Sequence, residues 1–220
     1  MNPVEASVSQ ITAPTAEGRR ERKKQRTRDA LIEAAMELFA AKGYERTAVH
    51  EITDAVDVSE RTFFRYFSNK EDLALSFAGD FSDALLTELA GRPSAEPPFA
   101  ALRNALHVAI AVLTADSRDL GAGRDDLPIM KLIETTPSLL AAYLRHMNDH
   151  NEEITRVLAE REGVDPAADL RPRCTAAVFS GLLIIANRQW RSEGGTVEAM
   201  LDAFDACASQ VAGALSGHWS

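Results

Sequence analysis

Apolar residues recur at helical spacing along the N-terminal third of the chain. Between residues 25 and 42 they follow one another at steps of three and one, which predicts a helix with one buried stripe: Leu31, Ala34, Ala35, Leu38 and Phe39. Gly43 can adopt the left-handed conformation that ends a helix. Thr47 is the expected cap of a second, short helix. A turn at residues 57–59 then leads into a third helix that reaches residue 67.

The same periodicity continues through the rest of the chain. Ser68 and Asn69 are expected to cap a fourth helix, which continues without a break to Gly91 over about 23 residues. Segment 93–98 is rich in Pro and is the clearest linker. Further helices are expected at about residues 99–115, 128–134, 137–162, 171–192 and 196–215. No run of alternating β-branched residues predicts a strand, so we expect an all-α chain of about nine helices.

Charge is distributed unevenly along this acidic chain. The formal net charge is −9, of which residues 71–220 contribute −10 and residues 1–70 contribute +1. Segment 19–28 alone holds seven basic residues and one Glu. Because phosphate attraction is screened within about 8–10 Å at cellular salt, a local basic patch is sufficient for nucleic-acid binding. The acidic remainder would face away from a nucleic acid and favour solubility.

The remaining composition narrows the class of protein. Cys174 and Cys207 are too few for a disulfide framework and fit no zinc motif, so we expect reduced, buried thiols in the cytoplasm. No apolar stretch reaches about 18 residues, so no membrane span is expected. Residues 1–18 are small and polar, lack the apolar core of a signal peptide and are expected to be a disordered tail.

Two short helices joined by a three-residue turn, at about residues 48–67, form the arrangement that reads the major groove of DNA. The first helix braces the second, which inserts its N-terminal residues among base edges. Phe63 and Phe67 are spaced i and i+4, as core residues are. Their neighbours then face outward: Arg61, Thr62, Arg65 and Tyr66. The pattern predicts a sequence-specific helix-turn-helix domain.

Residues 27–75 resemble the DNA-binding domain of the TetR family of bacterial one-component regulators. The matching residues are Ala34-Ala35, Leu38-Phe39, Lys42-Gly43-Tyr44, Thr47, Ile52, Val58-Ser59, Thr62-Phe63, Arg65-Tyr66-Phe67, Lys70-Glu71 and Leu73. The resemblance implies an all-helical homodimer in which residues 19–72 bind DNA and residues 73–220 bind a ligand and dimerise. Repression relieved by a small ligand is the usual mode. Segment 140–165 and the basic run 19–28 are also similar to actinobacterial subgroups that include mycofactocin-type regulators.

The resemblance also implies roles for single residues. The positions that commonly hold phosphates are Thr47, Tyr66 and Lys70. Glu60, Arg61 and Thr62 match base-facing positions, where Glu could accept from cytosine and Arg could donate to guanine. Phe64 stands where the family often has Tyr, so a phosphate bond is lost there. The full set expected at a palindromic, double-stranded operator is Arg26, Arg28, Thr47, His50, Ser59, Glu60, Arg61, Thr62, Arg65, Tyr66 and Lys70.

No motif of comparable specificity occurs in the C-terminal half. A hydrophobic or acyl-type ligand is expected between the helices at 99–115, 137–162 and 171–192, and the fourth helix would act as a rigid lever towards the DNA-binding part. The residues expected to line that site are His107, Ile110, Met130, Tyr143, Met147, Phe179, Leu183 and Trp190. The dimer is expected to use two stripes on the last two helices: Ala177, Gly181 and Ile184, and Leu201, Phe204, Ala208 and Val211. No cofactor is expected.

Several alternatives remain open at this point. The basic run could be a solubilising segment instead of a DNA-contacting arm that enters the minor groove. His146 and His150 are spaced i and i+4 and are either exposed surface residues or a metal pair. The two cysteines could instead sense redox state. An enzyme carrying a DNA-binding domain has no supporting motif, such as a phosphate loop or a nucleophile elbow. A closed, filled core between residues 99 and 192 would favour a DNA organiser without an effector.

Overall fold

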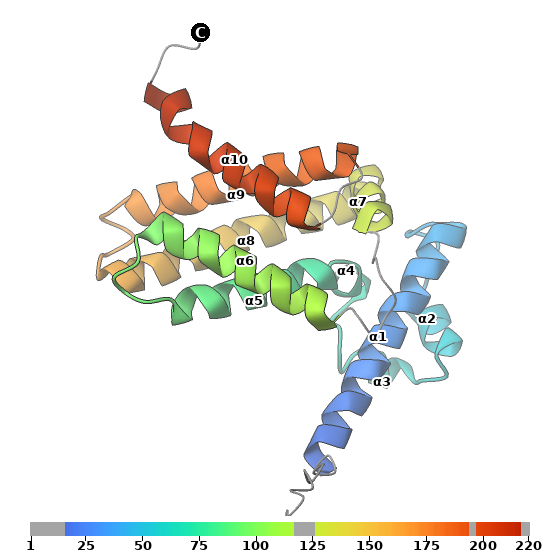
Figure 1. Cartoon of the computed structure of the whole chain (residues 1–220). Helices are drawn as coiled ribbons and strands as arrows, with labels where there is room; N and C mark the ends of the chain where they lie inside the picture. Colours follow the sequence, from blue (N-terminus) through green and yellow to red (C-terminus); the bar gives the residue numbers. More distant parts are fainter. Residues whose placement is uncertain (1–15, 117–125, 194–196, 217–220) are drawn as a thin grey trace, which may run out of the picture. The chain divides into compact units, whose positions relative to one another are not determined.

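The computed structural model describes residues 16–116, 126–193 and 197–216. All regular elements in these ranges are helices, ten in number, which confirms the predicted all-α class (Figure 1). The chain divides between Leu73 and Ala74 into two compact units. Residues 1–15 of the expected tail lie outside the described residues, and the first helix already begins at Ala16.

The N-terminal unit begins with α1 (Ala16–Lys42), α2 (Val49–Ala55) and α3 (Glu60–Phe63). Helix α1 starts earlier than expected because the basic run consists largely of Arg, Lys and Gln, which are good helix formers. Gly43 ends α1 as predicted, with a φ of +89° and its N–H donating to the carbonyl of Phe39 at 2.9 Å. The buried apolar residues of this unit are Leu31, Ile32, Ala35, Phe39, Tyr44, Ile52, Phe63, Phe67 and Leu73.

The expected fourth helix is in fact two helices, α4 (Lys70–Ala74) and α5 (Ser76–Gly91). Leu75 separates them, with φ −98° and ψ 9°, and its carbonyl accepts from the N–H groups of Ala78 at 2.9 Å and Gly79 at 3.2 Å. Neither Pro nor Gly marks the interruption, so the apolar pattern did not reveal it. The prediction of one continuous helix of about 23 residues that acts as a rigid lever is therefore wrong. Helix α5, with 16 residues, is about 24 Å long.

The C-terminal unit contains α5 and five later helices, which are α6 (Pro98–Asp116), α7 (Asp126–Thr135), α8 (Pro137–Glu162), α9 (Arg171–Glu193) and α10 (Val197–Ser216). Helix α5 packs on α6 and α8, α8 packs on α7 and α9, and α9 packs on α10 (Figure 1). Gly163 ends α8 as predicted, in the left-handed conformation at φ +65°.

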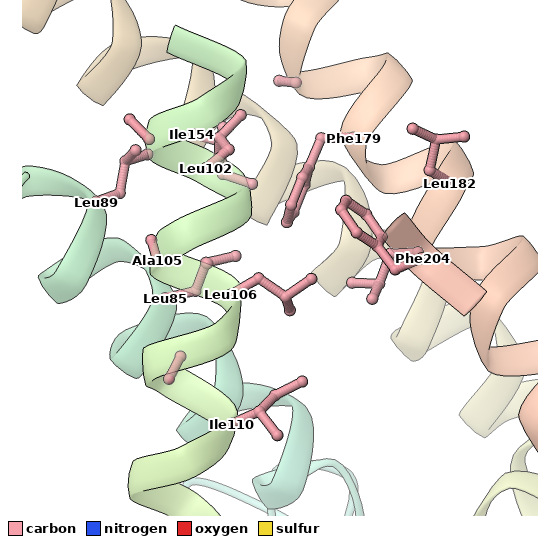
Figure 2. Close-up of a cluster of buried hydrophobic side chains, with 14 of the residues drawn as sticks. Leu85, Leu89, Leu102, Ala105, Leu106, Ile110, Ile154, Phe179, Leu182 and Phe204 are labelled. Atoms are coloured by element: carbon pink, nitrogen blue, oxygen red, sulfur yellow. The ribbon is translucent and has the colours of Figure 1, made fainter. Parts of the chain in front are cut away.

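The core of the C-terminal unit is formed by apolar residues from five helices. Figure 2 shows Leu85 and Leu89 of α5, Leu102, Ala105, Leu106 and Ile110 of α6, Ile154 of α8, Phe179 and Leu182 of α9, and Phe204 of α10. The rings of Phe179 and Phe204 meet edge to face at 5.4 Å and join the last two helices within one chain. Truncating residues of this kind to Ala typically costs about 2–5 kcal/mol.

Arginine side chains connect helices at the edge of this core. The guanidinium of Arg161 on α8 donates to the carbonyls of Leu89, Arg92 and Pro93 at 3.2, 2.6 and 2.9 Å, at the end of α5. The carbonyl of Leu89 also accepts from the N–H of Arg92 at 3.3 Å, and that of Pro93 accepts from the N–H of Glu96 at 3.0 Å. Arg161 therefore adds side-chain donors where α5 ends, which supports the cap at that end of the helix. Arg103 of α6 donates two hydrogen bonds to the carboxylate of Asp205 of α10, at 2.6 and 2.5 Å.

Among the described residues, no helix combines the length and the apolarity that a membrane span requires.

Candidate nucleic-acid interface

The turn between α2 and α3 has the geometry that the helix-turn-helix interpretation requires. Asp57 has a φ of +54°, which is unusual for a residue other than Gly and reverses the chain. The N–H of Val58 donates to the carbonyl of Thr53 at 3.0 Å. Ser59 then caps α3, because its hydroxyl oxygen accepts from the N–H of Thr62 at 3.2 Å. The predicted turn at residues 57–59 lies in this segment.

Helix α3 has one buried side and one exposed side. Phe63 is fully buried and Phe67 is 3% exposed, so the prediction that both are core residues is confirmed. Residues 64–66 continue as a tight turn, in which the N–H of Tyr66 donates to the carbonyl of Phe63 at 2.8 Å. The helix thus spans residues 60–63 and ends earlier than the predicted residue 67. On the exposed side an open depression of about 510 Å³ is lined by Arg61, Thr62, Phe64 and Arg65.

Arg65 also contacts the neighbouring Tyr66 on this surface. Arg65 donates to the hydroxyl of Tyr66 at 3.0 Å, and its guanidinium lies 4.9 Å from the centre of the Tyr66 ring. Ser59 and Glu60 are exposed at the start of α3, and His50 is exposed on α2. The exposed, positively charged and hydroxyl-bearing groups of this face match the chemistry of phosphates and base edges.

Thr47 does not cap α2. The capping residue is Ala48, whose N–H donates to a carboxylate oxygen of Glu51 at 2.8 Å. Glu51 also pairs with Lys42, and the Lys42 ammonium first, then the Ala48 N–H, hold the pKa of Glu51 below its usual value. Thr47 is 2% exposed and its hydroxyl donates to the carbonyl of Gly43 at 3.0 Å. Its side chain therefore offers less to a phosphate than the family resemblance implies.

Lys70 makes contacts within its own unit that the sequence did not indicate. Its ammonium donates to the carbonyls of Tyr44 at 2.8 Å and Thr47 at 2.9 Å, and it lies 4.1 Å from the centre of the Tyr44 ring. Lys70 thus connects α4 to the loop between α1 and α2. An ammonium group has three donors, so one remains for a phosphate.

The basic run lies on a helix, not on an extended arm. Arg26 is exposed on α1, whereas Arg28 is half-buried with its guanidinium 5.5 Å from the centre of the Phe67 ring. The minor groove is about 6 Å wide, and a helix with its side chains is about 10–12 Å across. In this helical form the run can contact phosphates along a groove but cannot enter the minor groove.

Half of the residues predicted to bind ligand lie in or beside the packed core. Ile110, Phe179 and Leu183 are buried core residues, and His107 lies 3.4 Å from the Asp205 carboxylate. Three further predicted residues, Met130 on α7 and Tyr143 and Met147 on α8, are partly exposed. The side chain of Trp190 is outside the described residues.

A polar group inside the C-terminal unit was missed. His150 is 6% exposed, so the exposed-surface interpretation is wrong for it. His146, one turn earlier, is half-buried and its Nε2 lies 3.1 Å from the Ser82 hydroxyl of α5. The apolar stripe of α8 could have indicated this, because Ala142 and Ile154 share the i, i+4 series with these histidines. No set of three His, Cys, Asp or Glu side chains in the described ranges could hold a metal.

Two further predictions about the C-terminal unit need correction. Phe204 is fully buried, and Leu201, Ala208 and Val211 pack against the same core, so this stripe of α10 faces its own chain. By contrast, Ala177 is exposed and Ile184 is 45% exposed on α9, with Gly181 half-buried between them.

Cys174 is exposed and Cys207 is half-buried, so the expectation of two buried thiols is wrong.

Comparisons with known proteins agree with this geometry. A family model described as "Bacterial regulatory proteins, tetR family" matches residues 31–77, and one described as "MftR C-terminal domain" matches residues 96–216. The second match confirms the resemblance to mycofactocin-type regulators. A crystal structure of a transcriptional regulator from Aquifex aeolicus covers 84% of this chain and 99% of its own, with a TM-score of 0.50 and 16% identity, and supports the fold.

Two relatives match over nearly their whole length. The transcriptional regulator TcmR of Streptomyces glaucescens is 38% identical over 209 residues, which cover 94% of this chain and 92% of TcmR. A protein named as the mycofactocin biosynthesis transcriptional regulator MftR, from Mycobacterium tuberculosis, is 31% identical over 86% of this chain and 93% of its own. Both relatives are named as transcriptional regulators, TcmR as one of the helix-turn-helix type. With these matches and the two family models, this chain belongs to the TetR family, with a C-terminal domain of the MftR type.

Proposed function

We propose that this TetR-family regulator is a repressor that leaves a palindromic operator when a small hydrophobic ligand binds its C-terminal unit. The observation that carries the proposal is the exposed side of α3. Four neighbouring side chains there combine two guanidinium groups, a hydroxyl and an aromatic ring around one open depression. DNA operators in the bacterial cytoplasm are the partners that such a surface fits.

We call the exposed side of α3 the reading face, and we propose one role for each residue that is predicted to bind DNA. Glu60, Arg61 and Thr62 contact base edges, with Arg61 donating to guanine. Phe64 is 54% exposed and has no hydroxyl, so it suits the methyl group of thymine. The residues proposed to contact phosphates and the sugar backbone are Arg26, Arg28, His50, Ser59, Arg65, Tyr66 and Lys70, with Thr47 in a lesser, buried role.

The role of Phe64 can be tested by removing one methyl group from the DNA. Replacing single thymines of the operator by uracil should weaken wild-type binding about 3- to 10-fold at one position of each half-site, since a lost apolar contact is small. The Phe64→Ala variant should bind both DNAs equally. Equal binding of both DNAs by the wild-type protein would assign Phe64 to the backbone instead.

The C-terminal unit is proposed to hold the ligand and the partner subunit. The half-buried side chains of Met130, Tyr143 and Met147 are candidates to line a hydrophobic site. The other predicted residues are the buried Ile110, Phe179 and Leu183, the partly exposed His107, and Trp190, whose side chain lies outside the described residues. A ligand shifts a regulator only if it binds the DNA-free state more tightly than the DNA-bound state. Since α4 and α5 are separate helices, a single rigid helix does not carry that preference along the chain.

Titration separates this proposal from a DNA organiser without an effector. The operator recovered by selection from random DNA is bound to the purified protein, and hydrophobic metabolites are added in turn while fluorescence anisotropy reports the affinity for the operator. The proposal expects at least one of them to weaken binding more than 10-fold. A panel that binds the protein yet leaves operator affinity unchanged would favour the organiser.

A further inference from the structure

One buried imidazole in the C-terminal unit has no protein partner in the part of the chain that the structure describes. His150 of α8 is 94% buried, and neither its Nδ1 nor its Nε2 has a hydrogen-bond partner there. Native proteins leave few buried polar side-chain atoms unpaired, and those that remain call for a water, an ion or a ligand. His150 has two such atoms on one ring.

The surroundings of His150 are apolar on one side and polar on the other. The Phe81 ring of α5 lies 6.3 Å from it, and the His146 ring stacks parallel to it at 6.5 Å. His146 has a partner, the hydroxyl of Ser82. One turn further along each helix, Leu85 and Ile154 belong to the apolar core (Figure 2). The unpaired imidazole therefore lies where the core between α5 and α8 gives way to polar side chains.

The protonation state of His150 restricts what can bind there. Burial, and then the charge of His146, lower the pKa of His150 to about 4, so the ring is neutral near pH 7. A neutral imidazole offers one N–H donor and one nitrogen acceptor. A hydroxyl group can donate to the acceptor nitrogen, whereas an ether or an alkyl chain has no donor and leaves that nitrogen unpaired. A carboxylate also lacks a donor and would bring an unpaired charge into an apolar site.

We propose that His150 is the polar anchor of the effector site, and that the effector is an apolar molecule carrying a neutral hydroxyl group, as an alcohol or a phenol does. The inference rests on the proposed function and narrows its ligand class from hydrophobic or acyl-type to hydroxylated. The hydroxyl of the effector hydrogen-bonds to the imidazole of His150, beside Phe81 and the pair formed by Ser82 and His146.

Small matched probes test this without knowledge of the natural effector. Phenol and anisole differ by one methyl group that removes the hydroxyl donor. Each is titrated into the full-length protein carrying ¹⁵N-labelled histidine, and the ring nitrogens are followed by NMR. We expect phenol to move both His150 nitrogen signals in a saturable way, with an affinity at least 10-fold higher than that of anisole. If neither probe moves these signals, or both move them equally, the proposal is wrong.

Variants identify the residue responsible. His150→Phe should abolish the preference for phenol, and His150→Gln, which keeps a donor and an acceptor, should restore part of it. Operator binding by both variants reports correct folding. A phenol preference that survives in folded His150→Phe would overturn the assignment.

Operator affinity distinguishes a failure of this inference from a failure of the proposed function. Ligand-induced release that shows no preference for hydroxylated compounds would retain the regulator and reject the hydroxyl anchor. Release of the operator by hydroxylated compounds from wild-type protein and not from His150→Phe would support both. Hydroxyl-dependent binding at His150 with unchanged operator affinity would support the anchor and reject ligand-controlled release.

Discussion

The ammonium group of Lys70 holds the loop between α1 and α2 to the start of α4. It donates to two backbone carbonyls, those of Tyr44 and Thr47, and lies over the Tyr44 ring. Hydrogen bonds from charged donors contribute about 1.5–3 kcal/mol to stability. The same group was expected to contact a phosphate, so a change at Lys70 affects both folding and DNA binding.

We expect Lys70→Met to lower the free energy of unfolding by about 2–3 kcal/mol, because two buried acceptors lose their donor. The matched control is Lys24→Met, which removes the same charge from an exposed pair with Glu21 and should change stability by less than about 0.5 kcal/mol. Urea denaturation of both variants gives the comparison. Unchanged stability of Lys70→Met would mean that these bonds do not hold the loop.

The buried imidazole of His150 predicts a pH-dependent stability. Burial, and then His146, lower its folded-state pKa to about 4, while the unfolded chain has the ordinary histidine value of about 6.5. Between these values the unfolded state binds more protons, so stability falls as the pH decreases from 6.5 to 4 and is fully present above 6.5. The loss over this interval is about 3 kcal/mol, and it should be absent in His150→Phe.

Chemical denaturation at several pH values, with the His150→Phe curve subtracted from the wild-type curve, isolates this contribution from the carboxylates that titrate in the same range. A difference that stays constant between pH 4 and 6.5 would show that His150 is protonated or solvated in the folded protein.

At the scale of the helices, Arg161 connects the end of α8 to the end of α5. Its guanidinium donates to three backbone carbonyls in the last turn of α5 and directly after it. We expect Arg161→Met to lower stability by about 2–3 kcal/mol. Arg156→Met on the same helix removes only exposed pairs with Glu153 and Glu160 and should cost less than about 0.5 kcal/mol. Equal melting curves for the two variants would contradict the capping role.

The helix ends illustrate what could be predicted from the sequence. Gly43 and Gly163 were identified as stops because a left-handed residue is favoured there, and both have positive φ. The break at Leu75 was not predictable, since an apolar residue in an apolar stripe carries no local signal. Thr47 was misassigned as a cap because Ala48 receives its cap from Glu51, a side chain one turn later.

The DNA-binding surface could be predicted from the sequence, whereas the dimer surface and the buried histidine could not. The outward side of α3 followed from Phe63 and Phe67 alone, since two buried residues one turn apart fix which neighbours face outward. The stripe of α10 was ambiguous, because an apolar face packs equally well on its own chain or on a second copy, and Phe204 packs on its own chain. His150 was missed because a histidine in an apolar stripe was interpreted by its polarity.

At the scale of the whole molecule, the outward face of α9 is the surface we expect at the dimer interface. Ile184 and Ile185 are 45% and 51% exposed, and Ala177 lies two turns away. Two copies of a face with small and branched apolar residues can pack closely around a two-fold axis. The operator should then be palindromic, because the protein symmetry imposes its own symmetry on the DNA.

We expect Ile184→Glu to shift the protein from dimer to monomer in analytical ultracentrifugation at micromolar concentration, since a charge would be buried at the interface. Operator affinity should fall at least 100-fold with it. Leu170→Glu is the control, because Leu170 is 61% exposed but lies before α9, outside this face. A dimeric Ile184→Glu variant would move the interface elsewhere.

The most direct test of the reading face is selection of double-stranded sites from random DNA by the purified wild-type protein and by Arg61→Ala. From wild-type protein we expect an inverted repeat with half-sites about 34–36 Å apart, or a nearby multiple. From Arg61→Ala we expect a loss of preference at one base pair in each half-site, worth about 1–3 kcal/mol. Recovery of asymmetric single sites, or an Arg61→Ala variant that weakens specific and random DNA alike, would contradict it.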